Sequence, residues 1–132
     1  MSKIFSMSEA ASIAIHSMVL IARSAAGINA VKIAENTGFS KNHISKVLQR
    51  MVKDDMLNSV RGPSGGFTLK KDPEKLSLLT IYESIEGPML ITDCPFENEV
   101  CHFDKCLMLN VVNKMALEFK KFLAKQTLQD YL

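Results

Sequence analysis

The order of apolar and polar residues along the chain predicts a mainly α-helical protein with one short β-hairpin. Residues 10–22 read AASIAIHSMVLIA, which is apolar on nearly all sides of a helix. This predicts a buried first helix that runs to about residue 25 and ends at Gly27. Ser6 and Glu9 have the spacing of a capping box, in which Ser6 caps this helix and Glu9 is its third residue.

Residues 28–57 predict two further helices joined by a tight turn. A short helix over residues 30–36 is followed by Gly38, and Ser40 is placed to cap a helix that reaches about residue 53. Thr37 departs from the pattern, because an apolar residue is usual at its position. An ordinary helical hairpin is the alternative to a helix-turn-helix, whose inward positions are occupied by Ile33, Ala34, Phe39, Ile44 and Val47.

A β-hairpin is predicted directly after these helices. Residues 57–60 and 67–69 are strand candidates, and the sequence RGPSGG joins them. A helix-turn-helix followed by a hairpin is a winged helix, in which this loop is the wing. The loop lacks the lysine and the spacing of a phosphate-binding loop. Residues 77–86 then predict a helix that Gly87 and Pro88 close.

A long final helix is predicted from about Cys106. A small domain leaves little core for such a helix, so its apolar stripe predicts a homodimer, and the alternative is a helix that folds back on its own domain. We therefore expect a winged helix-turn-helix domain over residues 1–90, a cysteine loop over 91–106, and a dimerisation helix and tail over 107–132. The stripe consists of Met108, Val111, Val112, Met115, Phe119, Phe122 and Leu123.

The distribution of charge along the chain suits a protein that binds a polyanion such as DNA, and scattered surface charge is the alternative. The chain has 132 residues and is 47% hydrophobic, which is typical of one globular domain. Its longest apolar stretch is too short and too polar to cross a bilayer, so we expect a cytoplasmic protein with reduced thiols. Residues 1–75 carry eleven Lys or Arg and six Asp or Glu, a balance of +5, whereas residues 76–132 carry five and eight, a balance of −3. The histidines lie in unrelated contexts and suggest no catalytic pairing.

All three cysteines fall within residues 93–106, in the sequence DCPFENEVCHFDKC. An odd count leaves one thiol over in any disulfide scheme. Cys94, Cys101 and Cys106 could instead hold an iron–sulfur cluster through soft thiolates. Zinc with His102 as a fourth donor is an alternative, although adjacent ligands such as Cys101 and His102 rarely reach one metal. Redox-active thiols, activated by Lys105, are another.

DNA would be read by the second helix of the helix-turn-helix and by the wing. Asn42 could contact adenine, and Lys41 or Lys46 could contact guanine or phosphate. Arg61 could enter a narrow minor groove, and Lys3 could add a phosphate contact. A solvated helix face is the alternative for any single residue. The full candidate set is Ser40, Lys41, Asn42, His43, Ser45 and Lys46 on the helix, and Arg61, Gly62, Pro63, Ser64, Gly65 and Gly66 in the wing, whose backbone N–H groups can approach phosphates.

The chain resembles one protein family over nearly its whole length. The resemblance rests on the order of these parts, on the sequence SVRGPSGGF and on the three-cysteine loop before a long helix. The family is that of winged-helix bacterial regulators that includes the iron–sulfur cluster regulator IscR and the nitric oxide sensor NsrR. The resemblance implies a homodimer that binds a palindromic operator in double-stranded DNA. It also implies a 2Fe–2S or 4Fe–4S cluster that senses redox state, nitric oxide or iron.

The resemblance bears on the cluster ligands as well. The spacing here is C-x6-C-x4-C, whereas x5 and x5 is common in the family. Members similar to IscR place a histidine three residues after the last cysteine, where this chain has Leu109. Members similar to NsrR use an acidic residue near the start of the first helix, donated by the other subunit, and Glu9 matches that position. A capping role for Glu9, His102 as the fourth ligand, and a cluster-free regulator using thiol redox chemistry or zinc remain alternatives.

Overall fold

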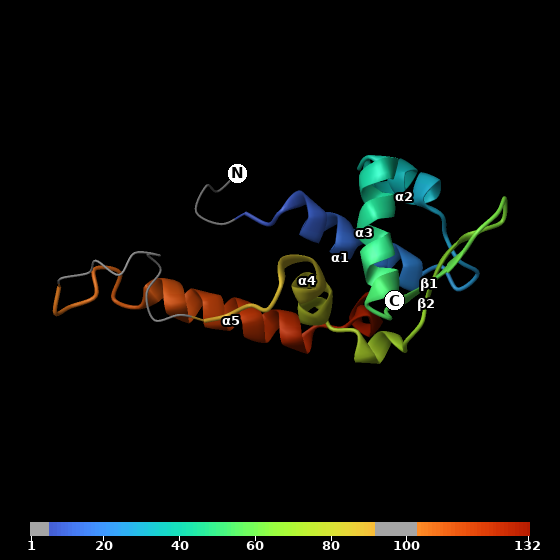
Figure 1. Cartoon of the computed structure of the whole chain (residues 1–132). Helices are drawn as coiled ribbons and strands as arrows, with labels where there is room; N and C mark the ends of the chain where they lie inside the picture. Colours follow the sequence, from blue (N-terminus) through green and yellow to red (C-terminus); the bar gives the residue numbers. More distant parts are fainter. Residues whose placement is uncertain (1–5, 92–102) are drawn as a thin grey trace.

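A computed structural model describes residues 6–91 and 103–132 and confirms the predicted fold class (Figure 1). The described residues form five α-helices, two short 3-10 helices and a two-stranded antiparallel sheet. In chain order these are α1 (Glu9–Ala22), α2 (Ala30–Thr37), α3 (Lys41–Lys53), β1 (Leu57–Val60), β2 (Gly66–Leu69), η1 (Pro73–Lys75), α4 (Leu78–Glu86), α5 (Val111–Lys125) and η2 (Leu128–Tyr131).

Helix α1 begins two residues later than its sequence predicts. Ser8, and not Ser6, caps it, because the Ser8 hydroxyl accepts the backbone N–H of Ala11 at 3.1 Å. The same hydroxyl donates a hydrogen bond to Glu86 at the end of α4, so a contact with another helix adds to the capping bond. Glu9 is therefore the first residue of α1 and not the third, and the predicted capping box is wrong.

The helix-turn-helix forms as predicted from α2 and α3. Gly38 ends α2 in the left-handed conformation, with φ of +83°, which a residue with a side chain rarely adopts. The side chain of Ser40 caps α3 by accepting the N–H of His43. Thr37 is satisfied within the turn, because its hydroxyl donates to the Ile33 carbonyl at 2.8 Å and accepts the N–H of Phe39 at 3.3 Å. Its polarity therefore costs the motif little.

The core lies between α1, α3 and α4, and the C-terminus also contributes to it. Fully buried side chains on the three helices include Ile13 of α1, Leu48 of α3 and Ile81 of α4. Leu123 of α5 and Leu128 of η2 belong to the same apolar cluster. Two backbone hydrogen bonds hold this end of the chain against the segment before α4. The N–H of Leu78 donates to the carbonyl of Gln126 at 2.9 Å, and the N–H of Leu128 donates to the carbonyl of Leu76 at 3.0 Å.

The wing is anchored to the segment between α1 and α2. Strands β1 and β2 pair in the register Leu57 with Leu69 and Val60 with Gly66. Ile28 bridges Phe67 of β2 through two backbone hydrogen bonds, of 2.8 and 3.2 Å. These bonds fix the base of the wing beside the helix-turn-helix.

Helix α5 begins at Val111, five residues after the predicted start at Cys106. Leu109 and Asn110 are both left-handed, with φ of 51° and 60°, so the helix cannot extend through them. The C-terminal half of α5 packs on α4, where the rings of Phe119 and Tyr82 meet edge to face at 6.3 Å. The rest of α5 extends away from the other helices (Figure 1).

Candidate DNA-binding surface and metal centre

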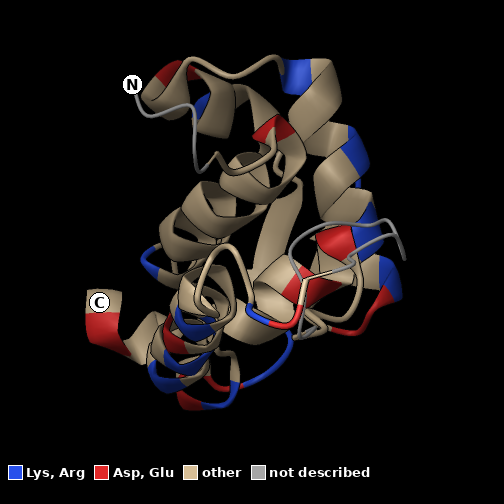
Figure 2. Cartoon of the chain, turned by 90° about the vertical axis from the view of Figure 1, so that its left-hand side faces the viewer, with Lys and Arg blue, Asp and Glu red and all other residues tan. Residues whose placement is uncertain are grey.

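Helix α3 presents a positively charged surface. It carries Lys41, Lys46, Arg50 and Lys53 and has no acidic residue, so the charges of the four cations are not neutralised within the helix (Figure 2). Of the predicted contacts, Ser40, Lys41, Asn42 and Lys46 are exposed, whereas His43 and Ser45 are half-buried. The N-terminus of α3 also favours anions, because its first backbone N–H groups point outward.

Sequence reasoning missed Arg50 and Lys53 on this surface. Arg50 is exposed and lies four residues after Lys46, which itself lies four residues after Asn42. Residues four apart share a face of a helix, so these three side chains form one line along α3. The helical spacing alone would have identified Arg50.

The wing combines exposed residues at its tip with two glycines that are packed against backbone. Arg61, Gly62, Pro63 and Ser64 are exposed. A Cβ atom on Gly65 would lie 2.1 Å from the carbonyl oxygen of Val60, and one on Gly66 would lie 2.7 Å from that of Ile28. The wing can therefore close only with glycine at both positions, which is a structural requirement beyond the predicted access to phosphates.

A half-open pocket of about 340 Å³ with a mixed polar and apolar lining lies between the wing and the start of α2. Pro63 and Ser64 line it on the wing side, and Asn29 and Lys32 line it on the other. Lys32 forms an exposed ion pair with Glu35 at 3.6 Å. Nothing in the sequence brings residue 32 to the wing, so this cation was not predicted as part of the surface.

Cys106 is the one predicted cysteine ligand within the described residues, because Cys94 and Cys101 fall outside them, as do His102 and Lys3. It lies half-buried in the turns before α5. Backbone N–H groups, first of Asn110 and then of Met108, hold the pKa of the Cys106 thiol below its ordinary value by stabilising the thiolate. The thiolate is the form that binds iron or zinc, so the chemistry of this residue fits a metal centre.

Leu109 stands where the resemblance to IscR would imply a histidine ligand, and it is unsuited to that role. Leu109 is exposed and left-handed, and its side chain has no donor atom. Among the residues that the structure describes, no three His, Cys, Asp or Glu side chains gather in a potential metal site. A search of the same residues finds no helix that is both long and apolar enough to cross a membrane.

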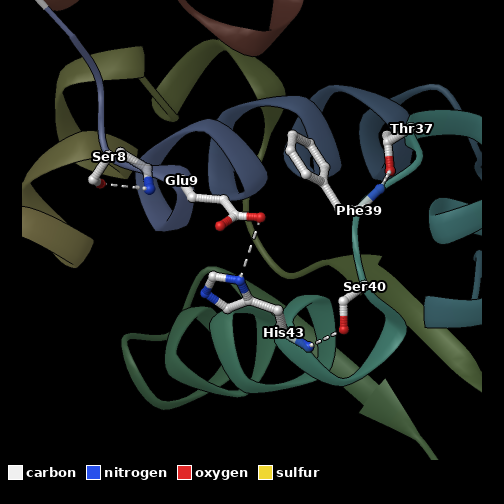
Figure 3. A network of polar contacts seen from close by, with 7 residues as sticks. Ser8, Glu9, Thr37, Phe39, Ser40 and His43 are labelled. Carbon is white, nitrogen blue, oxygen red and sulfur yellow. Dashed lines mark hydrogen bonds and ion pairs between the residues drawn. The ribbon is translucent and has the colours of Figure 1, made fainter.

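Glu9 lies beside α3. Its Oε1 atom is 3.9 Å from Nδ1 of His43, and the side chain of Glu9 is 65% exposed (Figure 3). The structure thus brings a candidate cluster ligand beside a candidate DNA contact. The two residues are 34 positions apart, and their sequence contexts give no sign of this contact.

Comparisons with known proteins find transcriptional regulators in sequence and the same fold in solved structures. Residues 7–132 match the family model described as "Rrf2: Iron-dependent Transcriptional regulator". The transcriptional regulator NsrR of Bacillus subtilis is 32% identical over 104 residues, which cover 77% of this chain and 71% of NsrR. IscR of Sodalis glossinidius is 24% identical over 99 residues, covering 75% of this chain and 60% of IscR.

Solved structures show the same fold at lower sequence identity. The global cysteine regulator CymR of B. subtilis superposes with a TM-score of 0.77 at 19% identity, covering 96% of this chain and 95% of CymR. IscR of T. potens superposes with a TM-score of 0.74 at 20% identity, covering 96% of this chain and 85% of that structure.

Proposed function

The chain belongs to the Rrf2 family of transcriptional regulators, and from that premise we propose that an iron–sulfur cluster controls its affinity for a palindromic operator. Its relatives are regulators and not enzymes, as its sequence predicts. In this proposal Cys94, Cys101 and Cys106 of one subunit and Glu9 of the other hold the cluster.

The observation that carries the DNA-binding part is the charge of α3. Four basic residues and no acidic one lie on a helix whose first two residues are exposed, beside a wing with an exposed arginine. Asn42 and Lys46 would contact base edges or phosphates, and Arg61 would enter the minor groove. Two such surfaces in a symmetric dimer would match the two halves of a palindrome.

The dimer is supported by exposed apolar residues along α5. Val111, Val112, Met115 and Phe122 lie on one stripe of the helix and are each 41–53% exposed. Met108 is 42% exposed but precedes the left-handed residues Leu109 and Asn110, so it does not continue the predicted stripe. Exposed apolar patches of this kind mark interaction sites, and a second copy of the helix offers the same stripe. Leu123 and Phe119 turn toward α4 instead, so the stripe divides between the core of its own domain and a partner.

The cluster is supported by the donor set and by the thiolate-favouring position of Cys106. When bound, an iron–sulfur cluster supplies the reactivity toward oxidants, nitric oxide or iron supply that sensing requires. Glu9 adds an oxygen donor, which binds iron less strongly than a thiolate does. Because Glu9 begins α1 and the cysteines precede α5, the cluster would link the domain of one subunit to the dimer helix of the other.

A cluster-free regulator that uses thiol redox chemistry or zinc is the second candidate. The lowered pKa of Cys106 favours it as much as it favours a cluster, since thiolates react with oxidants and bind zinc.

Substitutions separate these roles. Replacing any one of the three cysteines with Ala should abolish cluster binding, because too few thiolates would remain. Glu9→Ala should give a cluster that forms but is lost faster to oxygen or chelators, since water can occupy one site. Glu74→Ala removes another exposed carboxylate and should leave the lifetime unchanged. If His102→Ala shortens the lifetime and Glu9→Ala does not, the fourth ligand is His102.

Thermal unfolding of Glu9→Ala supplies the control for a purely structural role. Ser8 is the cap of α1, so losing Glu9 removes a favourable charge at a helix N-terminus, about 0.3–1 kcal/mol, and an exposed contact with His43 that adds at most about 1 kcal/mol. A loss of that size with an unchanged cluster lifetime would assign Glu9 to helix stability alone.

A further inference from the structure

His43 faces α1, and in this orientation it differs from its exposed neighbours at the start of α3. Ser40, Lys41 and Asn42 are exposed, whereas the imidazole of His43 is directed at the carboxylate of Glu9 (Figure 3). The imidazole is 36% exposed, compared with 65% for Glu9. This orientation does not suit a residue that reads bases directly.

We propose that His43 is a positioning residue for Glu9, and that the pair couples the cluster to the reading helix α3. This inference rests on the proposed function, in which Glu9 is a cluster ligand. It replaces the sequence-based assignment of His43 as a direct DNA contact. The coupling crosses the dimer, because Glu9 of one subunit would serve the cluster of the other.

The geometry allows one carboxylate to serve both partners. Oε1 of Glu9 faces His43 at 3.9 Å, and the largely exposed side chain leaves Oε2 available for iron. Carboxylates that bind metals are usually oriented by a hydrogen-bond donor on their other oxygen. A small movement would shorten the 3.9 Å separation to a hydrogen bond, with an imidazole N–H as the donor.

The consequence for DNA follows from the place of His43 in α3. It is the third residue of the helix, and its backbone N–H is bound by the Ser40 cap at 3.4 Å. A cluster that draws Glu9 toward it would also restrain His43, and with it the first turn that presents Lys41 and Asn42. Coupling between two sites is reciprocal, so operator binding should change the affinity for the cluster by the same factor by which the cluster changes the affinity for the operator.

The test compares cluster lifetimes in the absence of DNA, measured by decay of visible absorption with a chelator. His43→Ala should shorten the lifetime about two- to fivefold, the size expected for an exposed charge contact. His43→Gln retains an N–H donor and should lie closer to the wild type. In the Glu9→Ala background His43→Ala should have no further effect. His16→Gln is the control, since His16 instead contacts the Ser12 carbonyl within α1.

An unchanged lifetime in His43→Ala, or an equal effect with and without Glu9, would overturn the proposal. NMR of the cluster-free protein tests the contact alone: Glu9→Gln should shift the imidazole signals of His43 and leave those of His16 in place. Unshifted His43 signals would also overturn it. A protein that binds no cluster but shows the shift would refute the proposed function, and with it the coupling, while preserving the contact.

Discussion

Replacing Met115 with Asp should separate the proposed dimer. Met115 is near the middle of α5, is 53% exposed, and lies on the same side of the helix as Val111 and Phe122. In a symmetric dimer both copies of the residue would enter the interface. The substitution therefore removes two apolar side chains and introduces two carboxylates at once.

The expected effect is large compared with a typical surface substitution. Fully burying a methionine contributes about 1.5–3 kcal/mol, and about half of its surface remains to be buried, so the two copies together lose about 2 kcal/mol. Desolvating each unpaired carboxylate costs several kcal/mol more, unless the interface opens to admit water. A total of at least about 4 kcal/mol corresponds to a dissociation constant about 10³-fold higher.

Light scattering coupled to sizing measures this directly. Ala124→Asp is the matched control, because Ala124 is exposed and nine residues after Met115, which places it on the opposite side of α5. The wild type and Ala124→Asp should be dimers, and Met115→Asp should be a monomer or an unfolded chain. A wild-type monomer, or a Met115→Asp variant that stays dimeric at low micromolar concentration, would refute the reasoning.

Three further outcomes follow from the structure. Ser17 is fully buried, and its hydroxyl has no hydrogen-bond partner in the described structure. Ser17→Ala should therefore stabilise the fold by about 1 kcal/mol and raise the Tm by about 3–5 °C, and a lower Tm would contradict this. Arg61→Ala should weaken operator binding by about 1–3 kcal/mol, whereas Asn42→Ala should change which bases are preferred; equal losses on all sequences would contradict this division. In a variant with Cys94 and Cys101 replaced by Ser, Cys106 should be alkylated faster at pH 7 than the cysteine of an unstructured peptide. The reason is that its lowered pKa enlarges the thiolate fraction, and an equal rate would contradict stabilisation of the thiolate by backbone N–H groups.

Local patterns in the sequence predict the helix-turn-helix and the wing well. Gly38 and Ser40 signal the turn and the cap through conformations that depend on neighbouring residues alone. The strands follow from short apolar runs on either side of a glycine-rich loop. Thr37 breaks the apolar pattern, but it does not disturb the turn, because its hydroxyl finds partners within two to four residues.

The predicted helix starts were wrong where two residues could each cap the helix, or where backbone conformation outside the helical pattern sets its first residue. Ser6 and Ser8 can both cap a helix, and the contact of Ser8 with Glu86 of α4 accompanies the observed choice. The start of α5 moved from Cys106 to Val111 because Leu109 and Asn110 are left-handed, which helical spacing does not reveal. Each shift moves a helix start by only a few residues. The shift at α1, however, makes Glu9 the first residue of the helix and removes its predicted capping-box role.

The functional contacts that sequence reasoning missed are those between elements. Glu9 and His43 were assigned separately, one as a ligand and the other as a DNA contact, and only the packing of α1 on α3 brings them together. Lys32 approaches the wing because Ile28 pairs with Phe67. Arg50 is different, since its spacing from Lys46 was visible in the sequence.

Anaerobic purification followed by operator binding tests the central claim most directly. Iron, acid-labile sulfide and zinc are measured on the same dimer whose operator affinity is then determined with the cluster present and after its removal. We predict a coloured protein with iron and sulfide, little zinc, and an operator Kd that changes when the cluster is lost. A colourless protein that contains zinc or no metal, or an operator Kd that is the same with and without the cluster, would contradict the claim.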